Sequence, residues 1–251
     1  MLEIIDHGAI RELRLARPPA NALDPALLAS LRAGLAGARA AGREAVVLSG
    51  APGRFSGGLD VPALLALSKA EIRETWKTFF GVMRDIVASP IPTVAALTGH
   101  SPAGGTVLAM FTDYRVMAEG PFLMGLNEVQ VGLPVPRPLL RALTYVVGAR
   151  QAERLAVAGI LMGPAEALRC GLVDEVVAVE AVVPRAVAWA SELLSRPRAA
   201  MAATRRQARR EIASVFDDMD DRDIEAVVDL WFSAETQAAM RALVARLKKN
   251  A

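Results

Sequence analysis

Glu128 is the residue of this chain whose surroundings best suit acid–base chemistry. It is the only ionisable side chain between Glu119 and Arg137, in a stretch rich in apolar residues. A carboxylate among such neighbours is costly to ionise if it is buried, so its pKa rises toward neutrality. Such a pKa suits a general base that must also return the proton. The plain alternative is a surface glutamate on a short amphipathic turn.

A second candidate is the segment GHSPAGG at residues 99–105, which nearly fits the G-x-S-x-G pattern of serine hydrolases. The α/β-hydrolase triad needs a histidine after the serine, and neither histidine of this chain follows Ser101. The next residue is Pro102, which has no N–H for an oxyanion hole. Gly104 instead opens an uncharged helix, whose free N–H groups suit a developing oxyanion. A tight packing turn is an equally open interpretation.

The third candidate is the glycine-rich loop GRFSGGLD at residues 53–60. It lacks the Lys-Ser/Thr pair of a phosphate-binding P-loop and the G-x-G-x-x-G spacing of a dinucleotide site. It follows a strand and precedes a helix, so it offers backbone N–H groups at a strand end. A simple connection is the alternative, and Asp60 is more typical of a helix N-cap than of a catalytic acid.

The elements around these segments predict an α/β layered fold. Apolar runs and turn residues indicate strands at 2–6, 9–15, 45–49, 93–97 and 114–118, with a turn at 99–102. Helical spacing and capping residues indicate helices from Asp24-Pro25 to Gly42, at 69–88 and at 103–110. Strands and helices alternate to about residue 180, and the remainder is predicted to be helical.

Composition narrows the function classes. The longest stretch without Asp, Glu, Lys or Arg, residues 86–112, carries prolines and glycines that rule out one spanning helix, so we expect no membrane association. The first residues show no signal or transit peptide, so we expect a cytoplasmic protein. Cys170 is the only cysteine, which excludes an internal disulfide and a cysteine-cluster metal site. A net charge of +2, mixed along the chain, favours an anionic small molecule over a nucleic acid.

Taken together, the three segments resemble the enoyl-CoA hydratase/isomerase (crotonase) family, most closely the Δ3,Δ2-enoyl-CoA isomerases of the mitochondrial type. The resemblance covers about residues 10–180 and keeps the family's order and spacing. The matching stretches are residues 18–23, 54–60, 101–105, 113–115, 124–132 and 163–174.

The resemblance implies a crotonase-like spiral of ββα units with a C-terminal helical region. We therefore predict a core at residues 1–195 that binds a coenzyme A thioester, and an oligomerisation region at 196–251 that forms a homotrimer or a dimer of trimers. The basic run Arg205, Arg206, Arg209 and Arg210 and the acidic run Asp217–Asp223 are predicted to be solvated or inter-subunit helix faces. Contact with coenzyme A phosphates is the alternative.

The resemblance also implies the site. Glu128 matches the family's catalytic glutamate, and the backbone N–H groups of Leu59 and Gly104 match its oxyanion hole. No metal or redox cofactor is expected, because coenzyme A arrives as part of the acyl-CoA substrate. The residues implied in substrate binding are Ala20, Ala22, Gly57, Gly58, Leu59, Asp60, Val61, Gly104 and Asn127.

The residue at position 107 favours one reaction within this family. Hydratases of this family carry a second glutamate three residues beyond the oxyanion glycine, and here that position is Val107. Moving a double bond needs only one carboxylate, so we predict a Δ3,Δ2-enoyl-CoA isomerase of fatty-acid β-oxidation. Hydration or another acyl-CoA reaction is the first alternative, and a non-catalytic CoA-binding scaffold is the second. Compared with relatives, Gly57 stands where many have alanine, and the segment from Tyr114 to Glu128 is about one residue shorter. We expect the shortening to reshape the acyl pocket and change the preferred chain length.

Overall fold

Two sheets form the centre of the molecule in the computed structural model, which describes residues 1–249. The larger sheet has the order β1-β2-β3-β5-β7-β9; β1 and β2 are antiparallel and the other pairs are parallel. A smaller parallel sheet has the order β4-β6-β8. The bounds are β1 Leu2–His7, β2 Ile10–Leu15, β3 Ala45–Ser49, β4 Gly53–Arg54, β5 Thr93–Leu97, β6 Gly99–Pro102, β7 Tyr114–Ala118, β8 Met124–Gly125 and β9 Glu175–Val177.

The chain repeats one pattern through these sheets. A strand of the large sheet is followed by a strand of the small sheet and then by helical structure, three times: β3 and β4, β5 and β6, β7 and β8. Each repeat adds one strand to both sheets, which is a spiral of ββα units. The predicted fold class is therefore confirmed.

Local sequence explains where the long helices begin. The helix α1 starts at Pro25 because the side chain of Asp24 accepts a hydrogen bond from the N–H of Leu27. The helix α3 starts with a capping box between Ser68 and Glu71. The helices are α1 Pro25–Ala40, α2 Val61–Leu64, α3 Lys69–Val87, α4 Gly104–Met110, α5 Arg137–Val147, α6 Ala149–Ala158, α7 Pro164–Arg169, α8 Val182–Leu194, α9 Arg198–Ala208, α10 Arg210–Ala213, α11 Asp221–Trp231 and α12 Ala234–Lys249, with 3-10 turns η1 Glu128–Val131, η2 Val179–Ala181 and η3 Ser214–Phe216.

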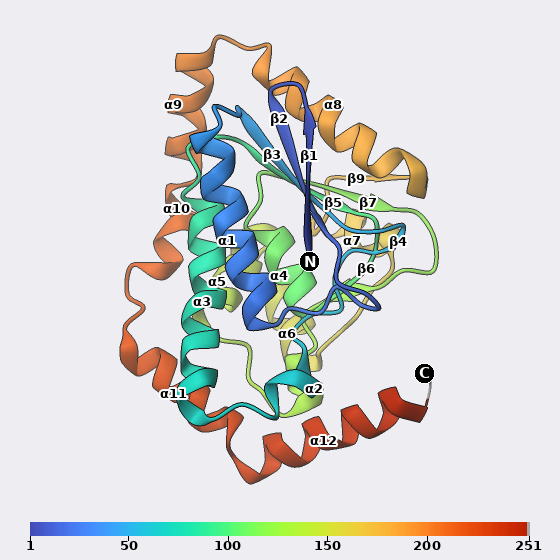
Figure 1. Ribbon diagram of the computed structural model, residues 1–251, viewed down its shortest axis with the longest axis vertical. Helices are drawn as coiled ribbons and strands as arrows, with labels where there is room; N and C mark the ends of the chain where they lie inside the picture. The colour runs from blue at the N-terminus through green and yellow to red at the C-terminus, as the bar shows by residue number, and fades with distance from the viewer. Residues whose placement is uncertain (250–251) are drawn as a thin grey trace.

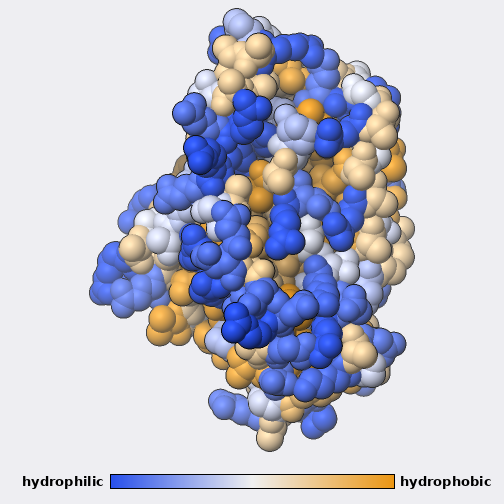
Figure 2. Space-filling view, turned by 90° about the vertical axis from the view of Figure 1, so that its left-hand side faces the viewer, coloured by the Kyte–Doolittle hydropathy of each residue, from blue (hydrophilic) through white to orange (hydrophobic). Residues whose placement is uncertain are grey.

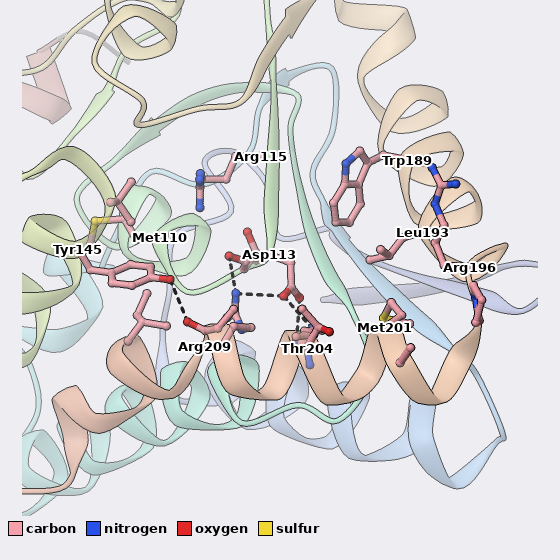
Figure 3. Close-up of a pocket in the computed structure, with 17 residues that line it drawn as sticks. Met110, Asp113, Arg115, Tyr145, Trp189, Leu193, Arg196, Met201, Thr204 and Arg209 are labelled. Carbon is pink, nitrogen blue, oxygen red and sulfur yellow. Dashed lines mark hydrogen bonds and ion pairs between the residues drawn. The ribbon is translucent and has the colours of Figure 1, made fainter.

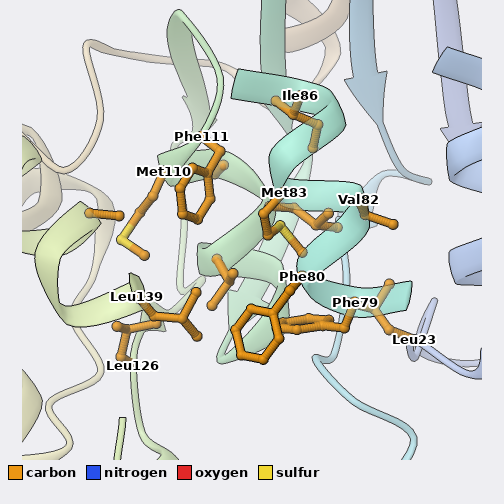
Figure 4. Close-up of a cluster of buried hydrophobic side chains, with 14 of the residues drawn as sticks. Leu23, Phe79, Phe80, Val82, Met83, Ile86, Met110, Phe111, Leu126 and Leu139 are labelled. Carbon is orange, nitrogen blue, oxygen red and sulfur yellow. The ribbon is translucent and has the colours of Figure 1, made fainter. Parts of the chain in front are cut away.

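Helices cover both faces of the large sheet (Figure 1). On one face α8 packs through Val182, Ala186 and Ala190 onto alternate residues of the strands. On the other face lies the main core, which includes α1, α3 and α4. Its centre is the contact of α3 with α4 and the segments that follow, shown by Phe79, Phe80, Val82, Met83, Ile86, Met110, Phe111, Leu126 and Leu139 (Figure 4).

The helices after residue 196 lie along one side and the lower end of the molecule (Figure 1). The side that faces the viewer in Figure 2 is mainly hydrophilic, with hydrophobic residues in patches between charged ones. Helix α11 packs on α3, and α12 packs on η1. Among residues 1–249, no helix combines the length and the apolar run that crossing a bilayer requires.

Most predicted elements lie within two residues of the observed ones, but the turn predicted at residues 99–102 is wrong. Those residues form β6, which pairs with β4 and β8. The partners are only two residues long, so neither shows the alternation that predicts a strand. The boundary predicted after residue 195 falls between α8 and α9; it stays a prediction, as does oligomerisation, and residues 250–251 lie outside the described part.

Candidate active site

The loop before α2 is held so that the N–H of Leu59 stays free. Leu23 and Leu59 form a parallel bridge, in which the N–H of Leu23 donates to Gly58 O at 2.7 Å and the N–H of Asp60 donates to Leu23 O at 3.0 Å. Backbone groups of successive extended residues point to opposite sides. The amide of Leu59 therefore points away from Leu23, and within residues 1–249 it donates to no acceptor.

Buried polar contacts fix the segment of Ala20 and Ala22 against this loop. The N–H of Gly57 donates to Ala20 O at 2.7 Å. Asn21, buried and at a φ of 48°, donates from Nδ2 to Phe55 O at 3.0 Å and accepts from Ser56 Oγ at its backbone oxygen at 2.8 Å. The two predicted binding segments thus form one unit.

Arg17 links this unit to the helices that follow. Its guanidinium lies 3.0 Å from Asp24 Oδ2 and 2.7 Å from Asp60 Oδ2. Asp60 also caps α2 by accepting from the N–H of Ala63 at 3.0 Å, as the sequence predicted, and Val61 is the first residue of α2. Asp60 therefore helps to position α2 and the loop before it, and its carboxylate is not free to act as an acid.

The turn into α4 presents the N–H of Gly104. Ala103 has φ 47° and ψ −117°, a strained backbone for a residue with a Cβ. Its N–H donates to Gly125 O at 2.8 Å. Thr106 Oγ1 donates to Ser101 O at 2.6 Å and accepts from the N–H of Gly125 at 2.7 Å. These bonds hold the strained turn, and the N–H of Gly104 stays unpaired within residues 1–249.

The two loops touch at their glycines. A Cβ added to Gly104 would lie 2.9 Å from Leu23 Cδ1 and 3.3 Å from Gly58 Cα, and a Cβ added to Gly58 would lie 3.2 Å from Gly104 N. The φ of 84° at Gly58 favours glycine there, and a Cβ at Gly104 would force Leu23 or Gly58 to shift. Because Leu59 N is bonded to the carbonyl carbon of Gly58, the amides of Leu59 and Gly104 are neighbours.

Ser101 is not placed to act as a nucleophile. Its side chain is buried and donates to Gly99 O at 2.9 Å. His100 Nδ1 instead accepts from the N–H of Leu123 at 3.2 Å. The serine-hydrolase interpretation therefore has no support in the geometry either.

Glu128 begins η1 and keeps a buried carboxylate oxygen without a partner. Oε2 is buried and, within residues 1–249, makes no hydrogen bond, although the residue as a whole is only half-buried. Burial raises the pKa of Glu128 to about 7, and a hydrogen bond from its own backbone N–H opposes that rise. A carboxyl group poised near pH 7 can both take and return a proton.

The pairing of β6 with β8 places Glu128 relative to the oxyanion loops. Gly125, the end of β8, is bonded to Ala103, the residue before Gly104. Glu128 follows Gly125 by three residues, which limits their Cα separation to about 11 Å. The adjacent Asn127 also has a buried, unpartnered oxygen, Oδ1, in the described chain.

Sequence reasoning missed Arg17, Asn21 and Thr106 as supports of the site, because single polar residues in loops carry no periodic signal.

A cavity of about 180 Å³ lies beside Glu128. Its lining comes from α3, the segment 133–138 and α11, and it is mainly apolar. Nothing in the sequence indicates that α11 forms one wall, because that contact joins segments far apart in the chain.

A larger cleft of about 710 Å³ lies along α9 and shares no lining residue with that site (Figure 3). In it Arg205 Nη2 lies 2.7 Å from Asp113 Oδ2, and Arg209 Nη1 lies 3.1 Å from Asp113 Oδ1. The prediction that these two arginines are solvated is wrong, because they form ion pairs with Asp113 and are mostly buried; the inter-subunit alternative for this helix stays a prediction. Arg206 and Arg210 are exposed, as predicted.

The acidic run is also engaged within the chain. Asp220 caps α11, and Asp218 and Asp223 lie 3.5 Å and 3.4 Å from the guanidinium groups of Arg141 and Arg137. Asp223 and Asp218 therefore help to join α11 and the segment before it to α5, a role that the sequence did not indicate.

Comparison with known proteins gives consistent matches. The family model described as enoyl-CoA hydratase/isomerase matches residues 6–250. Enoyl-CoA delta isomerase 1, mitochondrial, of Homo sapiens is 32% identical over 249 residues, 98% of this chain and 82% of that protein. Probable enoyl-CoA hydratase echA17 of Mycobacterium avium (strain 104) is 36% identical over 197 residues, 77% of this chain and 75% of that protein. The crystal structure of human mitochondrial Δ3,Δ2-enoyl-CoA isomerase has a TM-score of 0.93 at 31% identity, covering 99% of this chain and 98% of that one.

Proposed function

The chain belongs to the enoyl-CoA hydratase/isomerase family, and we propose that it is a Δ3,Δ2-enoyl-CoA isomerase. On this proposal it converts a 3-enoyl-CoA into the 2-enoyl-CoA in fatty-acid β-oxidation. The observation that carries the proposal is the carboxylate of Glu128, whose Oε2 is buried and has no hydrogen-bond partner in the part of the chain that the structure describes. Helix α4, where hydratases carry a second glutamate, has the buried Val107 and no ionisable side chain.

The proposed mechanism uses backbone amides to hold charge. The thioester oxygen binds the N–H groups of Leu59 and Gly104. When Glu128 takes the proton from C2, the resulting dienolate places negative charge on that oxygen. A donor aimed at such an oxygen is worth about 3–4 kcal/mol in the transition state.

Glu128 then returns a proton to C4. Both carbons lie on the same side of the bound chain, so one carboxyl group serves both steps. The pKa of about 7 supports this double role, because neither protonation state of Glu128 is strongly disfavoured near neutral pH. No metal or redox cofactor is needed for the transfer.

Replacement of Glu128 by glutamine tests this proposal. We expect Glu128→Gln to lower kcat for 3-enoyl-CoA by about 10²–10⁴-fold, because it removes the base while keeping the side-chain shape. The circular dichroism spectrum and the affinity for a saturated acyl-CoA should be nearly unchanged. Glu119→Gln is the matched control, since Glu119 is exposed at the start of the same segment. Substantial isomerisation by Glu128→Gln would contradict the assigned role.

Hydration is the second candidate, because the Mycobacterium avium relative at 36% identity is named a probable hydratase. The two functions separate when 2-enoyl-CoA is supplied. A hydratase forms 3-hydroxyacyl-CoA from it, whereas an isomerase with one carboxylate forms little. Cytoplasmic location stays a prediction; the human relative is named as mitochondrial.

A further inference from the structure

The cavity beside Glu128 has an apolar body. Trp76 and Phe80 of α3 form one wall, Val227 and Leu230 of α11 form another, and residues 133–138 close the third side. Lining of this kind suits a hydrocarbon, which loses contact with water on entry. Glu128 lines the same cavity, so whatever occupies it lies next to the carboxylate.

The charged groups that line the cavity differ in exposure. The Glu128 carboxylate has its Oε2 buried. Arg137 is 51% exposed and lies 3.4 Å from Asp223 Oδ2; it also donates to Asp218 O at 3.0 Å. Arg137 and Asp223 both line the cavity. A hydrocarbon that enters beside Glu128 therefore shares the cavity with an ion pair that is in contact with solvent.

We propose that Arg137, held by Asp223 and Asp218, closes the outer end of this cavity and sets the longest acyl tail that the enzyme accepts well. The inference rests on the proposed function, because Glu128 must act at C2 and C4 for the carbons beyond C4 to enter. Arg137 is thus a specificity-determining residue that does not touch the reacting atoms.

The size of the cavity gives the length. An apolar cavity of about 150 Å³ holds one benzene molecule, which has six carbons. The cavity here is of similar volume, about 180 Å³, so it accommodates about six carbons beyond C4. The acyl chain that fills it has about ten carbons.

Chain-length dependence tests the proposal. We would measure kcat/KM for straight-chain 3-enoyl-CoA thioesters from about six to fourteen carbons. Each buried CH₂ is worth up to about fourfold, so kcat/KM should rise to about ten carbons and then stop rising. A rise that continues to the longest chain would overturn the proposal.

Arg137→Ala removes the closing group. In this variant the ratio of kcat/KM for twelve carbons to that for eight should increase by about tenfold, because two further CH₂ groups gain a place out of water. Arg141→Ala is the matched control: Arg141 lies one turn along α5 and pairs with Asp218, but it does not line the cavity. Its ratio should stay within about twofold of wild type. An unchanged ratio in Arg137→Ala overturns the proposal.

A second variant, expected to shorten rather than lengthen the preferred acyl chain, keeps the test valid if Arg137→Ala folds poorly. Val227→Phe fills the cavity from the α11 wall and should shorten the preferred chain while leaving Arg137 in place. Calorimetric affinities for saturated acyl-CoA of the same lengths should show the same limit. If these ligands bind with that limit but no 3-enoyl-CoA is isomerised, the proposed function fails. If isomerisation proceeds with no limit, only the role of Arg137 fails.

Discussion

At the residue scale, Glu128 illustrates how one environment serves chemistry and opposes stability. Its pKa rises to about 7 because burial disfavours the charged carboxylate. In the unfolded chain the same group has its ordinary pKa of about 4.5. The folded protein therefore binds more protons than the unfolded chain between these two values. Stability from Glu128 is fully present below pH 4.5 and is lost as pH rises through 7.

This sign predicts that removal of the charge stabilises the protein above about pH 4.5, with the full gain above about pH 7. Glu128→Gln should raise the free energy of unfolding at pH 8 by up to about 3 kcal/mol, since glutamine needs no ionisation. At pH 4, where the wild-type carboxyl is mostly protonated in both states, the two proteins should differ little. Urea titrations at both pH values measure the difference. An equal gain at pH 4 and pH 8 would show that packing, not ionisation, is responsible.

Sequence could suggest this environment because charge is missing around Glu128 over a long stretch. It could not show that Oε2 lacks a partner within residues 1–249, since two walls of the cavity beside Glu128 come from α3 and α11, which are distant in sequence. Asn21 is a similar case. Its buried side chain supports the Gly57–Gly58 loop through Phe55 O, and nothing local in the sequence marks that contact.

At the element scale, the contact between η1 and α12 is one of those that hold the Glu128 segment in place. Gly132 ends η1 with φ 74°, and Thr236 of α12 donates from Oγ1 to Gly132 O at 2.7 Å. A Cβ on Gly132 would lie 3.1 Å from Thr236 Cα, which is backbone and cannot rotate away. The close approach of α12 therefore requires glycine at this position.

The variant Gly132→Ala, compared with a control, should separate the effect of backbone strain from the effect of moving η1. Its left-handed φ alone should cost about 1 kcal/mol of stability, and the contact with Thr236 should shift η1 and lower kcat about tenfold or more. Gly42→Ala is the matched control, because Gly42 has φ 69° with nothing within 4 Å of an added Cβ. It should lose similar stability and keep full activity. Thermal unfolding and steady-state kinetics of both variants provide the measurement. Equal activity in the two variants would show that the position of η1 does not control catalysis.

Element prediction succeeded where a segment's own residues decide its structure. The capped, amphipathic α1 and α3 need no partner to be recognisable. It failed for β6, and it did not identify β4 or β8, because strands of two to four residues exist only through each other's hydrogen bonds. These short strands nevertheless position Gly104 and Glu128. The small sheet therefore builds the part of the site that the local sequence pattern predicts least well.

At the scale of the whole molecule, a few buried ion pairs attach the C-terminal helices to the sheet. Asp113, just before β7, is 9% exposed and faces both Arg205 and Arg209 of the α9 region. Burial lowers the pKa of Arg209, and the carboxylate of Asp113 opposes that shift. Sequence could not distinguish this arrangement from a solvated basic face, because arginines spaced four apart on a helix look the same in both.

The buried position of Asp113 predicts a large effect from a small change. Asp113→Asn keeps the shape but leaves two mostly buried guanidinium groups close together without a counter-charge, so it should lower the free energy of unfolding by about 3 kcal/mol or more. Asp229→Asn is the matched control: Asp229 pairs with Lys69 at 2.6 Å, but the side chains are 65% and 56% exposed, so the loss should stay below about 1 kcal/mol. Denaturant unfolding of the two variants measures both losses. If they were equal, the attachment of α9 would depend on apolar packing rather than on Asp113.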